Sequence, residues 1–130
     1  MPVIIPTTLD AALHALAERG EALTPMAGCT DLLVFWPSRV EQHERHWLDL
    51  SGLNDDLRFI RWSESHLEIG ALTTYWDVIA DARIACEFPM LIESARQVGA
   101  IQIQARGTWA GNIANASPAA DGVPALMAYD

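Results

Sequence analysis

The sequence predicts an α+β fold, in which a small β-α-β-β subdomain precedes a second subdomain of mixed α/β character. Before residue 52, short apolar runs alternate with one long stretch of helical periodicity. After it, two strand-like runs flank a short polar turn, and apolar residues then recur at helical spacing. The chain has 130 residues, of which 51% are hydrophobic, and this suffices for one modest core. We therefore expect subdomains at 1–52 and 53–130.

The first subdomain is expected to begin with a strand at Val3–Ile5. Thr8 is a suitable cap for the amphipathic helix that follows, and Gly20 ends this helix at the position where glycine is favoured. Two further strands are expected, one at Leu23–Met26, parallel to the first, and one at Trp47–Leu50.

The second subdomain is expected to open with a hairpin of strands at Leu57–Trp62 and His66–Ala71. Thr74 then caps a helix, and Pro89 begins another, since proline is favoured in the first turn. The segment Ala100–Gln104 is expected to be extended.

A turn of small residues interrupts the apolar stretch Leu23–Val34. Gly28 allows close approach of the backbone to a ligand, and Thr30 caps a brief apolar helix. The N–H groups around Cys29 and Thr30 suit an anionic group. The alternative for this stretch alone is an ordinary strand-turn-helix corner.

A second turn-rich stretch covers residues 107–121, where Gly107 and Gly111 again allow close approach. Ser117-Pro118 predicts a helix start with Asp121 in its first turn, which suits phosphate. The alternative is a plain loop with a capped helix behind it. The stretch also carries short polar side chains, at Thr108, Asn112, Asn115 and Ser117.

Two anion-type turns in one chain indicate a diphosphate held between two loops. Neither turn matches G-x-G-x-x-G or G-x-x-x-x-G-K-[ST], so the dinucleotide fingerprint and the P-loop do not apply.

Together, the segments Ala27–Leu33 and Thr108–Asp121 resemble the FAD-binding domain of the molybdenum hydroxylases, which include xanthine dehydrogenase and aerobic carbon monoxide dehydrogenase. The family loops read A-G-G-T-D-L and T-x-G-G-N-I-x-x-A-S-P-x-x-D. The segment Ile69–Thr74 and the helix from Pro89 to Val98 also fit. The resemblance covers essentially the whole chain and implies the molybdopterin dehydrogenase (PCMH-type) FAD-binding fold.

The resemblance also implies which residues contact FAD. The first loop would face its phosphates, and the second would do so from the other side. Asp121 would lie near the sugar-alcohol chain or the ring, whereas no residue is expected to be catalytic or to bind metal. The implied cofactor-binding positions are Met26, Ala27, Gly28, Cys29, Thr30, Asp31, Leu32, Val98, Thr108, Trp109, Ala110, Gly111, Asn112, Ser117 and Asp121.

The chain departs from the family pattern at three places. Cys29 replaces the second glycine of the first loop, Trp109-Ala110 replaces a small apolar residue and a glycine, and Gln104-Ala105 replaces an Arg-Asn pair. Cys29 or Ala110 would be strained by about 1 kcal/mol or more if its φ had to be positive. Cys29 is either a reactive thiol at a helix start or a small residue filling a turn.

Composition narrows the function classes. The formal net charge is −9 and all eight basic residues are arginine, so a nucleic-acid footprint is not expected. Cys29 and Cys86 form no C-x-x-C pair, and the cluster His43, Glu44 and His46 lacks zinc-protease spacing. We expect no membrane segment and no secretory signal, and hence a cytoplasmic protein.

The resemblance implies a flavin-dependent oxidoreductase component, probed here at the level of one subunit or domain. Electrons would come from iron–sulfur clusters on one partner subunit, supplied by a molybdenum-cofactor subunit, and would pass through FAD to an acceptor. The family domain continues beyond the helix after Asp121, so we expect a C-terminally truncated fragment that binds FAD weakly and self-associates.

Two rivals remain open. In the first, the departures at Cys29, Trp109 and Ala110 close the flavin site, leaving a flavin-free structural or docking module of the same complex. In the second, the chain is a different flavoprotein of the same fold with its own substrate pocket. The second would need a substrate-facing base, and none is visible.

Overall fold

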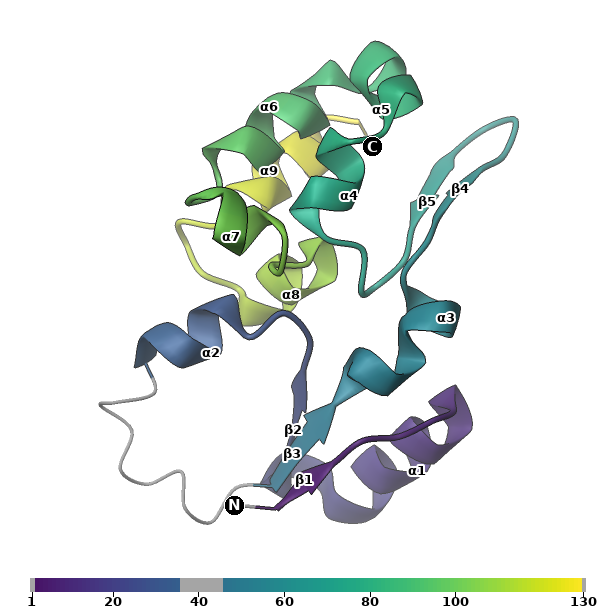
Figure 1. Ribbon diagram of the computed structural model, residues 1–130, viewed down its shortest axis with the longest axis vertical. Helices are drawn as coiled ribbons and strands as arrows, with labels where there is room; N and C mark the ends of the chain where they lie inside the picture. Colours follow the sequence, from purple (N-terminus) through teal and green to yellow (C-terminus); the bar gives the residue numbers. More distant parts are fainter. Residues whose placement is uncertain (1, 36–45, 130) are drawn as a thin grey trace.

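A computed structural model describes residues 2–35 and 46–129, apart from the side chains of Leu33 and Phe35. Figure 1 shows a three-stranded sheet with helix α1 in one half of the molecule and a group of helices in the other. The first half contains β1 (Val3–Ile4), α1 (Leu9–Arg19), η1 (Gly20–Ala22), β2 (Leu23–Met26), α2 (Thr30–Phe35), β3 (His46–Asp49) and η4 (Leu50–Leu53).

The second half begins with a short helix and a hairpin, and its remaining elements are all helices. These elements are α3 (Asn54–Leu57), β4 (Ile60–Trp62), β5 (Leu67–Ile69), α4 (Tyr75–Ile79), α5 (Ala82–Glu87), α6 (Pro89–Gln97), α7 (Ile101–Gln104), α8 (Trp109–Asn115) and α9 (Gly122–Met127). This arrangement is the α+β fold that the sequence predicts.

The parallel sheet has the strand order β1-β3-β2. β1 and β2 run parallel, as expected, and β3 lies between them with Trp47 paired to both Val3 and Thr24. Trp47 and Leu48 are almost fully buried because the central strand is covered by neighbours on both edges. The carboxyl end of β2, at Met26, leads directly into the first glycine-containing turn.

The helix α1 begins and ends as its sequence indicates. The Thr8 hydroxyl oxygen accepts a hydrogen bond from the Ala11 N–H at 3.2 Å, and Gly20 ends the helix with φ of +53°. Its buried face joins a first hydrophobic cluster, to which Leu53, Leu57 and Leu72 also contribute. The first core is therefore completed from beyond residue 52, and a division of the chain there stays a prediction.

The hairpin is shorter than expected because Leu57 ends α3 and Gly70 lies past the end of β5. Local caps determine the helices that follow it. Thr74 and Asp77 form a capping box on α4, and Asp81 accepts hydrogen bonds from two N–H groups at the start of α5. The strand-like expectation missed α5, whereas the start of α6 at Pro89 is confirmed.

Two expectations about the C-terminal third are wrong. Ala100–Gln104 is not extended, because Gly99 turns the chain at φ of +49° and the Ala100 carbonyl accepts from Ile103 and Gln104. Residues 117–120 form a turn in which the Ser117 hydroxyl accepts from the Ala119 N–H, so α9 begins only at Gly122. The helix start within the second motif is instead that of α8, capped by Thr108.

Candidate functional site

The two loops singled out by the sequence touch each other. A Cβ at Gly28 would collide with the backbone carbonyl of Arg106, and the Arg106 Nε donates a hydrogen bond to the Gly28 carbonyl oxygen at 3.4 Å. The sequence suggested that Gly28 makes room for a diphosphate. In the structure the room that a side chain would need is taken by the other loop.

The buried segment Leu72–Thr74 holds the second loop in place. The Trp109 N–H donates to the Thr73 carbonyl at 3.3 Å, and the Tyr75 N–H donates to the Gly107 carbonyl at 3.1 Å. Thr74 and Thr108 therefore pair as an isolated antiparallel bridge. The resemblance included this segment, but its anchoring role depends on long-range pairing that no local pattern reveals.

The first loop connects β2 to α2 through a strained residue. Cys29 has φ of +60°, and so it takes the left-handed conformation that glycine adopts more easily. Its thiol donates to the Ala27 carbonyl at 3.5 Å. Burial raises the pKa of the Cys29 thiol, the nearby Asp49 raises it further, and Arg106 opposes both. A raised pKa keeps the thiol protonated, which favours the turn-filling role over the reactive one.

The second loop is the first turn of α8. The Thr108 hydroxyl oxygen accepts from the Gly111 N–H at 3.0 Å, and a Cβ at Gly111 would meet that oxygen at 2.7 Å. Ala110 is helical, so the strain considered for it is absent. Within the described residues the Ala110 N–H has no hydrogen-bond acceptor, which leaves a donor at the helix start for an anion.

Asn112 and Asp121 meet where α8 approaches α9. The Asn112 side-chain oxygen accepts from the Gly122 N–H at 3.3 Å, and the Ser94 hydroxyl donates to the Asp121 carbonyl at 2.8 Å. Asp121 stands at the start of α9, is exposed, and makes no side-chain cap. Its carboxylate is therefore free of helix capping, in contrast to the expectation that it sits within a first turn.

Tyr75 links the acidic residues of the two loops. Its side chain is 2% exposed, and its hydroxyl has no hydrogen-bond partner among the described residues. Burial raises the pKa of Tyr75 to about 12, and the charges of Asp121 and Asp31 raise it as well. Both carboxylates therefore act on the same buried hydroxyl, so the structure brings the start of α2 and the start of α9 to one region.

Three of the proposed positions differ from the rest. The Trp109 side chain is 2% exposed and packs on the Tyr75 ring with centroids 4.9 Å apart, so its indole belongs to the core. Val98 ends α6 and packs on the second hydrophobic cluster. Among the described residues, no hydrogen bond joins Val98 or Ser117 to the first loop.

An open pocket of about 260 Å³ lies beside the contact between the loops. We call it the Arg106 pocket. It is lined by Ala27, Gly28, Ser51, Asn54, Arg58, Leu72, Thr74, Ala105, Arg106 and Thr108.

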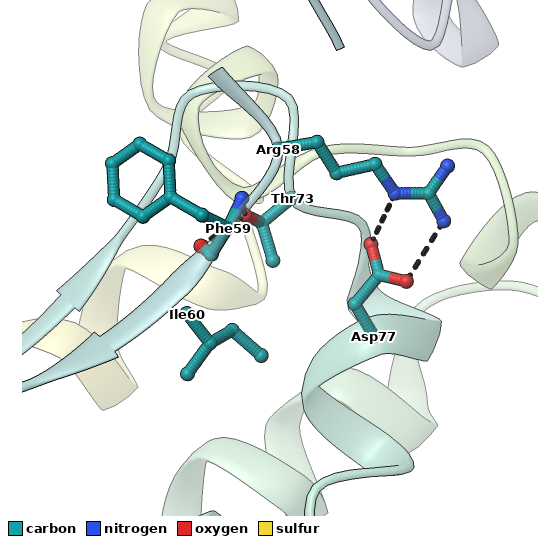
Figure 2. A pocket seen from close by; sticks show the side chains of 5 residues that line it. All are labelled: Arg58, Phe59, Ile60, Thr73 and Asp77. Atoms are coloured by element: carbon teal, nitrogen blue, oxygen red, sulfur yellow. Dashed lines mark hydrogen bonds and ion pairs between the residues drawn. The ribbon is translucent and has the colours of Figure 1, made fainter. Parts of the chain in front are cut away.

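A neighbouring pocket of about 240 Å³ also contains Arg58 (Figure 2). There the Asp77 carboxylate accepts two hydrogen bonds from the Arg58 guanidinium, at 2.9 and 2.8 Å. This pairing neutralises Arg58 and ties the chain before β4 to the start of α4. The neighbouring pocket contains no residue of either loop, so we assign it a structural role.

The geometry fits a diphosphate-containing ligand. Two helix starts converge, one at Thr30 and one at Trp109, and the glycine between them leaves no side chain in the way. Hydroxyls and one arginine surround the junction, whereas the acidic side chains lie at the Tyr75 hydroxyl. An α+β domain that presents two amide-lined loops face to face is of the class that binds a dinucleotide by its diphosphate.

The comparisons with known proteins identify that class more closely. Residues 1–130 match the family described as the FAD binding domain in molybdopterin dehydrogenase, and the chain belongs to this family. The chain is similar to the carbon monoxide dehydrogenase medium chain of Afipia carboxidovorans, with 34% identity over 122 residues, 94% of this chain and 41% of the relative. It is also similar to the glyceraldehyde dehydrogenase medium chain of Sulfolobus acidocaldarius, with 32% identity over 88% of this chain and 40% of the relative.

Among solved structures, a Cu,Mo-CO dehydrogenase in its cyanide-inactivated form matches with a TM-score of 0.88. The identity is 31%, and the match covers 98% of this chain and 44% of the other. The recognition of the family and of its FAD-binding fold is thus confirmed. The chain spans about two fifths of the length of the curated relatives that it matches.

Other sequence features contribute no site. His43 and Glu44 lie outside the described residues, and the His46 ring nitrogen Nδ1 contacts an Arg19 guanidinium nitrogen at 2.6 Å. In the parts of the chain that the structure describes, no group of three His, Cys, Asp or Glu residues could hold a metal ion. In the same parts, no helix has the length and apolar character needed to cross a membrane.

Proposed function

We propose that this chain is the FAD-binding part of a molybdenum-containing hydroxylase or dehydrogenase and that it acts in electron transfer. The observation that carries the proposal is the contact between the two family loops, in which Gly28 meets Arg106 and two helix starts converge. Bound FAD would supply the redox chemistry, namely acceptance and donation of one or two electrons at its ring system.

The chain's own residues bind and orient. The N–H groups at the starts of α2 and α8 would hold the diphosphate, with Thr108 keeping the second start rigid through its cap. Asp121 would accept a hydrogen bond from a hydroxyl of the sugar-alcohol chain or from a ring N–H. The protonated Tyr75 hydroxyl lies beneath and remains available as a donor because its pKa is about 12.

In this proposal electrons reach FAD from iron–sulfur clusters of a partner subunit and come originally from a molybdenum-cofactor subunit. Two relatives are named as medium chains of dehydrogenases, which supports an assembly of several chains. The acceptor that reoxidises FAD is NAD, oxygen or a quinone. Co-purification with those two partners, and flavin reduction on adding the reduced substrate of the complex, would test this route.

FAD binding itself is tested with Asp121→Asn. The amide keeps the size but loses the charge-assisted hydrogen bond, so the FAD dissociation constant should rise roughly tenfold or more. Asp81→Asn is the matched control, because Asp81 caps α5, asparagine caps equally well, and no site residue is involved. Flavin titration that shows the same affinity in both variants would remove Asp121 from the site.

The rival docking module also has an observation in its favour. Ile101, Ile113 and Met127 are each at least half exposed, so apolar surface is available for a partner. A purified protein that is yellow and releases FAD on denaturation supports the flavin function. A colourless protein that ignores added FAD while still binding its partner subunits would support the docking module.

A further inference from the structure

The Arg106 pocket opens directly beside the two loops. Ala27, Gly28 and Thr108 belong to both the pocket and the proposed diphosphate site. A dinucleotide held by the loops must extend from the diphosphate in two directions. One of its halves therefore has this pocket as the nearest hollow surface.

The pocket contains one cation whose charge is not neutralised. Arg58 is held by both oxygens of Asp77, whereas Arg106 donates only to the Gly28 carbonyl, at 3.4 Å. Among the described residues no carboxylate lies within ion-pair distance of Arg106. In a chain of net charge −9, an exposed, unpaired guanidinium at the loop junction favours a phosphate group.

The rest of the pocket suits a purine nucleoside. Leu72 and Ala105 provide apolar surface. Asn54 donates its side-chain N–H to the Ser51 carbonyl at 2.9 Å, which leaves its side-chain oxygen as an acceptor for an exocyclic amine. No acidic side chain lines the pocket, whereas Asp31 and Asp121 act on Tyr75 elsewhere.

We propose that the Arg106 pocket receives the adenosine-phosphate half of the dinucleotide and so makes the domain selective for FAD over FMN. This inference rests on the proposed function. It also assigns a direction to the cofactor, with the adenosine at Arg106 and the sugar-alcohol chain at Asp121. Arg106 contacts the phosphate, and the remaining pocket residues contact the nucleoside.

The test measures binding of FAD, FMN and ADP by titration calorimetry to the protein and to Arg106→Gln. We expect Arg106→Gln to weaken FAD and ADP about tenfold and FMN less than twofold. Arg96→Gln is the control, because Arg96 is an exposed arginine that pairs with Glu93 away from the pocket. Its affinities should equal those of the unchanged protein.

A second variant guards against an indirect effect on the loops. Ala105→Glu places a negative charge in the pocket at an exposed, helical position and leaves Arg106 in place. It too should weaken ADP and FAD more than FMN, while circular dichroism shows an unchanged fold. Equal loss of FAD and FMN, or unchanged ADP affinity in both variants, would overturn the inference.

Failure of the proposed function is a separate outcome. If the unchanged protein binds ADP but neither flavin, the flavin function is wrong, and the pocket is a nucleotide site. If it binds FAD and neither variant alters that affinity, the flavin function holds and the inference is wrong. Binding of none of the three ligands at millimolar concentration would refute both.

Discussion

Replacement of Gly28 by alanine should destabilise the protein even when no flavin is present. The added Cβ would collide with the Arg106 carbonyl, which is backbone and cannot rotate away as a side-chain tip can. Overpacking of this kind costs about 1–3 kcal/mol. For a chain of this length, such a loss lowers the melting temperature by roughly 3–12 °C.

The matched control is Gly20→Ala. Gly20 has φ of +53° and nothing within 4 Å of its added Cβ, so alanine there meets backbone strain of about 1–2 kcal/mol without a collision. Adding Gly20→Ala to Gly28→Ala should give additive losses, because the two sites share no contacts in the described chain.

The assay is thermal unfolding of the flavin-free protein, followed by FAD titration of each variant. We expect Gly28→Ala to lower the melting temperature without ligand and to weaken FAD as a consequence of the displaced loop. An unchanged melting temperature combined with lost FAD binding would show that Gly28 faces the diphosphate and not Arg106. That result would refute the loop contact.

Three other predictions concern stability. Cys29→Gly should stabilise the protein by on the order of 0.5 kcal/mol, because relief of left-handed strain exceeds the entropy cost of glycine, and a urea titration measures it. Tyr75→Phe removes an unpartnered buried hydroxyl and should leave the free energy of unfolding within about 1 kcal/mol, whereas a loss above 2 kcal/mol would reveal a bound partner. Burial raises the pKa of Asp77, but hydrogen bonds from Arg58 and Thr74 outweigh it and hold that pKa below its usual value of 3.8. The stability from Asp77 is thus complete above that value and lost as pH falls through the folded pKa, so the melting-temperature deficit of Asp77→Asn, on the order of 1 kcal/mol at pH 7, should shrink below pH 4.

The parts of the fold that the sequence predicts well depend on contacts within a few residues. The caps at Thr8 and Thr74 and the helix start at Pro89 each involve a side chain or ring acting on its own first turn. Such effects are nearly independent of the rest of the molecule. This is why three helix starts could be predicted without knowing what the helices pack against.

The parts that could not be predicted depend on distant partners. Alternation of isoleucine and glutamine over Ile101–Gln104 resembles a strand, but the Gln104 side chain donates to the Arg96 carbonyl and holds the segment against α6 as a helix. The helix start at Thr108 was hidden because its Trp109 N–H is satisfied by Thr73, an interaction across 36 positions. The pairing of sequence motifs with a family nevertheless identified both loops.

The contact between Gly28 and Arg106 changes what the glycine of the first loop means for binding. A glycine in a ligand loop is usually explained by close approach of the ligand, and that explanation requires nothing of the free protein. Here the glycine is needed for the two loops to touch, so the helix starts of α2 and α8 are held together by folding and not by FAD. Binding then does not have to order both loops, which would otherwise reduce affinity. Substitutions at this contact should therefore affect stability first and flavin affinity second, whereas substitution of Asp121 should affect affinity alone.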